Sequence, residues 1–186
     1  LTCRARSTIM FMAPLLSRFG QFTLGEPGGC TIGKNRPINR HLEAFSQMGA
    51  QIEFKDGSYK GHVQGGLKGA EVIFEKNTVM GTESVLLSSV LASGITTILN
   101  AAQEPEVDDL ILLLTKMGAI IERVTDRTIR VEGVTTLHGA SHEILPDRNE
   151  AATFAIAAAV TRGDLLIKNT KPSDMTALLA KLEKIG

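Results

Sequence analysis

The sequence lacks several features that mark particular classes of protein. Its 186 residues include no tryptophan, one tyrosine and two cysteines, and its net charge is zero. Without a basic surface or a series of aromatic side chains for stacking, it does not fit a nucleic-acid-binding protein. Two cysteines are too few for a disulfide framework, so a reducing compartment, the cytoplasm, is expected. No apolar run approaches the roughly 20 residues that cross a bilayer, so no membrane association is expected.

Helix-length apolar segments recur in pairs along the chain and indicate an internal repeat. Each has apolar residues at helical spacing and a glycine at or after its last turn, where a left-handed cap favours glycine. The first members of the pairs lie at 7–20, 82–94 and 149–163, and the second members at 41–52, 109–121 and 176–186. Residue 1 is Leu rather than Met, and the chain is expected to be a piece of a longer protein or a processed product.

Strand-like runs separate these predicted helices. They lie at 50–54, 62–67, 70–75, 95–101, 119–124, 128–134, 142–145 and 164–169. Helices and strands that alternate in repeated units predict an α/β fold, with several sheet-and-helix units around a common core. The predicted helices are nearly apolar all round, and the segment 154–160 carries no charge, so we expect them to be buried on every side.

Cys30 is the first candidate for chemistry. It follows Gly28 and Gly29 in a predicted loop, and Lys34 and Arg36 come shortly after it. Cationic neighbours lower the pKa of a thiol, and a glycine-rich loop lets the thiol move into and out of a site. Such a cysteine attacks an electrophilic carbon or delivers a proton. The alternative is an inert loop cysteine.

A cationic group follows this loop. Arg36, Arg40 and His41 lie at the predicted start of a helix, where backbone N–H groups add to an anion site. A guanidinium held there binds a phosphate or a carboxylate through two hydrogen bonds. The alternative is an ordinary solvated first turn, and the same holds for Arg6 before the first helix.

Two polar segments precede later helices. The loop 75–83 joins a strand to a helix, a usual ligand edge in α/β folds, and Lys76 and Thr78 there could contact phosphate. The alternative is a capping loop with Thr82 as the cap. The segment 103–109 carries four carboxylates, which suit the positive end of a helix dipole.

The remaining polar residues give weaker indications. Asp147 and Arg148 follow a predicted strand and form either a structural pair at a domain crossing or part of a site. The four histidines do not have the spacing of metal ligands, so no metal site is expected. The chain also has no phosphate-binding loop, no dinucleotide fingerprint and no nucleophile elbow.

Several motifs, in order and at nearly constant spacing, resemble one family of enzymes. They lie at 27–41, 100–119, 129–134, 137–154 and 178–186. From about Arg6 to Gly186 the chain resembles the UDP-N-acetylglucosamine 1-carboxyvinyltransferases, which are enolpyruvyl transferases. The resemblance implies an α/β (α+β) inside-out barrel of repeated βαβαββ units, incomplete in this chain. Residues 1–145 would hold the latter two units of the first domain, and 146–186 the start of the second.

The resemblance also implies a reaction and its residues. An enolpyruvyl group moves from phosphoenolpyruvate to the 3′-hydroxyl of UDP-N-acetylglucosamine by addition and then elimination of phosphate, in the first committed step of peptidoglycan precursor synthesis. No metal or organic cofactor is implied, and this piece alone is expected to be inactive, because the family's catalytic Asp lies outside it. The matching catalytic residue is Cys30. The matching substrate-binding residues are Arg6, Arg36, Pro37, Ile38, Asn39, Arg40, Lys76, Asn77, Thr78 and Val79.

The chain departs from the family's pattern at a few positions. One extra residue, Lys34 or Asn35, separates Cys30 from Arg36, and Asn39 stands where an Asp is usual. Arg40 stands where the family is commonly apolar, Met80 replaces a Gly and Gln103 an Arg. Two alternatives remain open: an enolpyruvyl transferase with another acceptor, such as a shikimate-type one, and a divergent or truncated homologue that binds nucleotide sugar without turnover.

Overall fold

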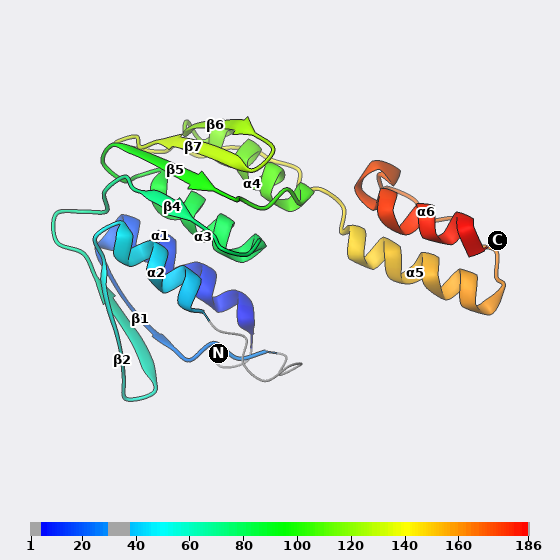
Figure 1. The fold of residues 1–186 in the computed structure, drawn as a ribbon, viewed down its shortest axis with the longest axis horizontal. Coiled ribbons are helices and arrows are strands. Elements are labelled where there is room, and N and C mark those ends of the chain that lie inside the picture. Colours follow the sequence, from blue (N-terminus) through cyan, green and yellow to red (C-terminus); the bar gives the residue numbers. More distant parts are fainter. Residues whose placement is uncertain (1–4, 30–37, 186) are drawn as a thin grey trace. The chain divides into compact units, whose positions relative to one another are not determined.

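The computed structural model describes residues 5–29 and 38–185 (Figure 1). It divides into two compact units, Leu1–Ser141 and His142–Gly186. Cys30, Arg36 and Pro37 lie outside the described residues, and so does the extra residue at 34 or 35. In the described part of the chain, no helix is long and apolar enough to span a bilayer.

The first unit contains two similar series of elements. The first repeat comprises η2 (Arg6–Phe11), α1 (Met12–Phe19), β1 (Gln21–Gly25), α2 (Asn39–Gln47), β2 (Gln51–Lys55) and β3 (Ser58–His62). The second repeat comprises β4 (Glu71–Ile73), α3 (Val79–Ser89), β5 (Ile95–Leu99), α4 (Pro105–Lys116), β6 (Ile120–Thr125) and β7 (Thr128–Glu132). From α1 and from α3 onward, the two repeats match element for element, which agrees with the predicted βαβαββ unit.

The strand order confirms this correspondence. The first sheet has the order β1-β3-β2 and the second β4-β5-β7-β6, so β5, β7 and β6 repeat the arrangement of β1, β3 and β2. All pairs are antiparallel except β4 with β5, which run parallel because α3 provides the crossover between them. Strand β4 has no counterpart beside β1 among the described residues.

The helices of the first unit lie between its two sheets (Figure 1). Helix α1 packs on β1 and β3, α3 packs on β5 and β7, and α1 packs against α3. Helix α3 also contacts α2 and α4, so it lies at the centre of the unit. Its buried residues include Val85, Leu86 and three serines, which fits a helix with no polar face. Ser88 and Ser89 satisfy their hydroxyls by donating to carbonyl oxygens one turn back, on Val85 and Leu86.

Glycines with left-handed backbone conformations lie at the end of α1 and in the turn between β2 and β3. Helix α1 ends at Gly20, whose φ of 70° is left-handed and whose N–H donates to the carbonyl of Leu16. Asp56 and Gly57 join β2 to β3 with φ values of 52° and 69°, the turn that matches strand twist in a two-residue hairpin. The strand predicted at 62–67 is wrong, because β3 ends at His62 and a turn follows it.

The regular secondary structure in the described residues of the second unit is all helical. It contains α5 (Arg148–Thr161), η3 (Pro172–Met175) and α6 (Thr176–Ile185), and η3 packs against both helices. The strands predicted at 142–145 and 164–169 are wrong, since neither segment has a neighbouring strand with which to pair in the part of the chain that the structure describes. The prediction that α5 is buried on every side is also wrong: Phe154 is 53 % exposed and Val160 78 %.

Candidate active site

The first predicted site residue lies against the start of the cysteine loop. Arg6 opens η2 and is half-buried. Gly29, the residue before Cys30, has a φ of 100°, and a Cβ built on it would lie 3.1 Å from the backbone nitrogen of Arg6 and 3.0 Å from its Cβ. A side chain at position 29 would therefore be strained and crowded. The fold therefore places Gly29, which precedes Cys30, next to the backbone of Arg6. The spacing of these residues in the sequence could not reveal this contact.

The start of α2 carries the next three predicted residues. Ile38 is the N-cap of α2, is buried, and has no side chain that accepts from the helix N–H groups. Asn39 is exposed and Arg40 is half-buried, and no acidic residue lies in the first turn. A helix N-terminus without a capping side chain or a carboxylate retains its partial positive charge. This end of α2 is thus favourable for an anion.

His41 lies beneath this helix start and joins it to α3. It is 5 % exposed, and its Nδ1 is hydrogen-bonded to Oγ of Ser84, 2.8 Å away. The Ser84 hydroxyl also lies within 3.5 Å of the sulfur of Met10, so residues from η2, α2 and α3 meet at this point. Sequence reasoning placed His41 in a cationic group and missed this buried contact.

The environment of His41 keeps its imidazole neutral. Burial, followed by the positive charges of Arg6 and Arg40, lowers the pKa of His41 from 6.5 to about 4. The prediction that His41 contributes a positive charge near neutral pH is therefore wrong. Both arginines nevertheless lie close enough to act on one imidazole, which links the two segments that flank the cysteine loop.

The loop before α3 supplies the remaining predicted residues. Lys76 and Asn77 are exposed, and Thr78 and Val79 are half-buried. Thr78 is the N-cap of α3, because its Oγ1 accepts a hydrogen bond of 3.2 Å from the N–H of Gly81. Ser84 follows Thr78 by six residues, about 9 Å along the helix axis at the usual rise of about 1.5 Å per residue. Thr78 and Ser84, the residue that contacts His41, therefore belong to one rigid helix.

Thr82 is not the cap that the sequence allowed as an alternative. It is fully buried, donates from Oγ1 to the carbonyl of Thr78 over 2.8 Å, and accepts from the N–H of Ala102 over 3.0 Å. A hydroxyl in that position ties the start of α3 to the segment that leads into α4. A side chain inside the helix, one turn after the cap, cannot satisfy the free N–H groups at the helix end.

Carboxylates gather at the start of α4, as the sequence predicts. Glu104 is the N-cap, Pro105 follows it, and Glu106 and Asp108 lie in the first turn. Burial, followed by the negative charges of Glu106 and Glu104, raises the pKa of Glu83 on α3. The negative charges at the start of α4 therefore also act on a carboxyl group in the second turn of α3. The sequence pattern did not indicate this interaction.

Asp147 has a structural role in the second unit. Its carboxylate accepts from the N–H groups of Asn149 and Glu150 over 2.8 and 3.3 Å, so it is the N-cap of α5.

His138 and His142 are not part of a metal-binding group: the described residues contain no cluster of three or more metal-ligating side chains.

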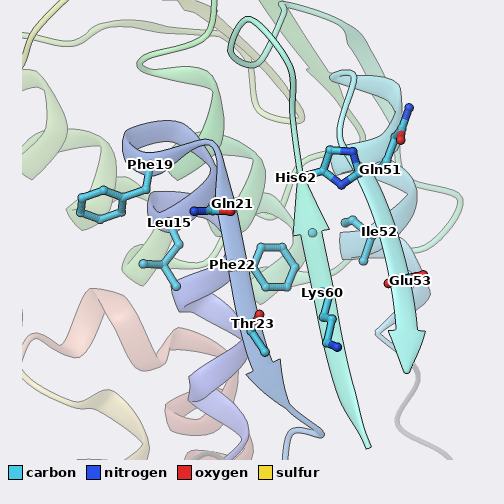
Figure 2. Close-up of a pocket in the computed structure, with 11 residues that line it drawn as sticks. Leu15, Phe19, Gln21, Phe22, Thr23, Gln51, Ile52, Glu53, Lys60 and His62 are labelled. Carbon is cyan, nitrogen blue, oxygen red and sulfur yellow. The ribbon is translucent and has the colours of Figure 1, made fainter. Parts of the chain in front are cut away.

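A large hollow in the described first unit lies elsewhere. It has a volume of about 1080 Å³, and its walls are α1 and the sheet β1-β3-β2 (Figure 2). Glu53 and Lys60 in its wall lie opposite each other on β2 and β3, and Lys60 forms an ion pair with Asp56, so this wall has no excess of positive charge. None of the predicted site residues lines this hollow. Since positive charge attracts an anionic substrate, the start of α2 with Arg40, close to Arg6, is the better candidate site.

The family follows from comparison with known proteins. The family model for EPSP synthase (3-phosphoshikimate 1-carboxyvinyltransferase) matches residues 1–186, the whole chain. The chain belongs to this family. Solved structures of enolpyruvyl transferases share its fold. NikO from Streptomyces tendae has a TM-score of 0.66 at 23 % identity over 80 % of this chain and 36 % of that one. EPSP synthase from Acinetobacter baumannii has a TM-score of 0.64 at 23 % identity, covering 84 % and 35 %.

More similar members of the family carry a different acceptor in their name. The UDP-N-acetylglucosamine 1-carboxyvinyltransferase of Paramagnetospirillum magneticum is 50 % identical over 186 residues, which cover all of this chain and 43 % of the relative. The protein of that name from Shewanella denitrificans is 49 % identical over 181 residues, 97 % of this chain and 43 % of the relative. The predicted enolpyruvyl-transferase family and fold are confirmed. The chain spans less than half the length of these relatives.

Proposed function

We propose that the chain is part of a UDP-N-acetylglucosamine 1-carboxyvinyltransferase. The observation that carries this proposal is the identity of 46–50 % to proteins of that name over 97 % or more of the chain. The reaction transfers the enolpyruvyl group of phosphoenolpyruvate to the 3′-hydroxyl of UDP-N-acetylglucosamine. It takes place in the cytoplasm, in the first committed step of peptidoglycan precursor synthesis.

The proposed chemistry needs a proton donor and positively charged groups near the phosphates of the substrates. Cys30 gives its proton to the methylene carbon of phosphoenolpyruvate, the 3′-hydroxyl adds to the neighbouring carbon, and the loss of phosphate and a proton then restores the double bond. Both substrates carry phosphate. Arg6, Arg40 and the uncapped start of α2 support this assignment, because they concentrate positive charge at both ends of the loop that carries Cys30.

The substrate-binding residues are part of the same proposal. Arg6 and Arg36 contact the ligands, the segment 36–40 holds the uridine part, and the segment 76–79 binds the nucleotide sugar from the start of α3. The Thr78 cap supports the last assignment, because it fixes the backbone of this loop at a helix N-terminus. We also propose a domain boundary at residues 145–146. The separation of the chain into two compact units between Ser141 and His142 supports it.

The test is phosphate release by the full-length protein that contains this chain. We expect release from phosphoenolpyruvate with UDP-N-acetylglucosamine and none with shikimate 3-phosphate as the acceptor. Cys30→Ala should lower the rate by about 100-fold or more, the usual contribution of a positioned proton donor. Release with shikimate 3-phosphate alone would refute the proposed acceptor. Full activity of Cys30→Ala would refute the proposed chemistry.

A further inference from the structure

Arg40 has no counter-charge among the described residues. Ion pairs join Lys60 to Asp56, Arg123 to Asp108 and Arg130 to Glu132, but none involves Arg40. Glu43 lies three residues further along α2, within the usual reach of a helical pair, and it does not pair with Arg40 either. A half-buried guanidinium that lacks a carboxylate has lost part of its hydration without an ion pair in return.

The surroundings of Arg40 add further positive charge. It occupies the first turn of α2, whose N-cap, Ile38, provides no capping oxygen and whose first turn contains no acidic residue. Arg6 acts on the same buried imidazole, that of His41. A guanidinium without an ion pair, at a helix N-terminus that has no capping oxygen, is stabilised by a nearby anion. The start of α2 therefore favours an anionic ligand.

We propose that the guanidinium of Arg40 binds a phosphate group of the substrate. This inference rests on the proposed function and extends it, because it names the chemical group of the substrate that Arg40 contacts. Guanidinium presents paired N–H donors that match phosphate oxygens. The phosphate comes either from the diphosphate of the nucleotide sugar or from phosphoenolpyruvate.

The test compares Arg40→Leu, Arg40→Lys and Arg18→Leu in the full-length protein. Leucine and arginine have similar helix propensity, so the first change removes charge without weakening α2. Arg18 is exposed near the end of α1 and contacts the ring of Phe19, so it is a matched control for the loss of one arginine. Calorimetric titrations measure the affinity for UDP-N-acetylglucosamine, uridine and phosphoenolpyruvate, each at low and high NaCl concentration.

We expect Arg40→Leu to weaken the binding of one phosphate-bearing substrate by about tenfold or more at low salt, the usual effect of losing a charge-assisted hydrogen bond. The difference should shrink at high salt, because ions screen the lost attraction. The affinity of Arg40→Lys for this substrate should lie between those of Arg40→Leu and the wild type. The affinity of Arg18→Leu should equal that of the wild type. We assign the contacts of segment 36–40 with uridine to groups other than the Arg40 guanidinium, so uridine should bind all variants equally. The substrate whose affinity falls identifies the phosphate.

Two results would overturn the inference alone. One is unchanged affinity of Arg40→Leu for both phosphate-bearing substrates, and the other is an equal loss of uridine binding, which would indicate a change of shape rather than a lost phosphate contact. A wild-type protein that binds neither substrate would overturn the proposed function and this inference together.

Discussion

Protonation of His41 should destabilise the protein in mild acid. The folded structure holds the pKa of His41 at about 4, against 6.5 in an exposed histidine. The unfolded chain therefore binds a proton at a higher pH than the folded one, and stability is lost as pH falls through this window. The full loss below pH 4 is about 3 kcal/mol, at ~1.4 kcal/mol per pKa unit. About 1.4 kcal/mol of it should already be lost at about pH 5.5.

The measurement is urea unfolding at about pH 7.5 and about pH 5.5, with His41→Asn as the test variant. Asparagine does not titrate, and its amide can hydrogen-bond to Ser84 in place of Nδ1. This variant should be less stable than the wild type at the higher pH, because it loses ring packing, but its loss between the two pH values should be smaller by about 1.4 kcal/mol. His62→Asn, at an exposed position, should lose as much as the wild type. Equal losses for the wild type and His41→Asn would refute the reasoning.

Two further predictions concern stability. Thr96 is 1 % exposed and its hydroxyl has no hydrogen-bond partner among the described residues. Thr96→Val should therefore raise the free energy of unfolding by about 1 kcal/mol, while Thr97→Val on the other face of β5 should change it little. A lower free energy of unfolding for Thr96→Val would contradict this. A Cβ on Gly133 would lie 1.6 Å from the carbonyl oxygen of Ala92, so Gly133→Ala should lower the thermal midpoint by several degrees, whereas Gly139→Ala, in open space, should leave it nearly unchanged.

The sequence predicted helices better than strands, for a physical reason. Each predicted helix is present because apolar spacing and a terminal glycine are local signals. Strands β1 and β3 were missed because Gln21–Gly25 and Ser58–His62 have few β-branched residues, and their stability depends on pairing with each other. The segment 164–169 looks more like a strand than either, but it has no neighbour with which to pair in the described second unit.

The candidate site was predictable only as separate pieces. Motif resemblance named Arg6, Arg40 and Thr78, and each lies at the beginning of a helix in the structure. No local pattern showed that Gly29 lies on Arg6 or that His41 reaches Ser84, because these contacts depend on how helices far apart in the chain pack together. The neutral state of His41 follows from the same packing.

The central position of α3 has a consequence for how the first unit unfolds. By sequence α3 belongs to the second repeat, but it packs against α1 and α2 of the first as well as α4 and its own sheet. In elongated repeat proteins each unit contacts only its neighbours, and the ends open one unit at a time. Here the loss of either repeat would expose the apolar surface of α3. The two halves of the unit therefore have to melt together, in a single cooperative transition.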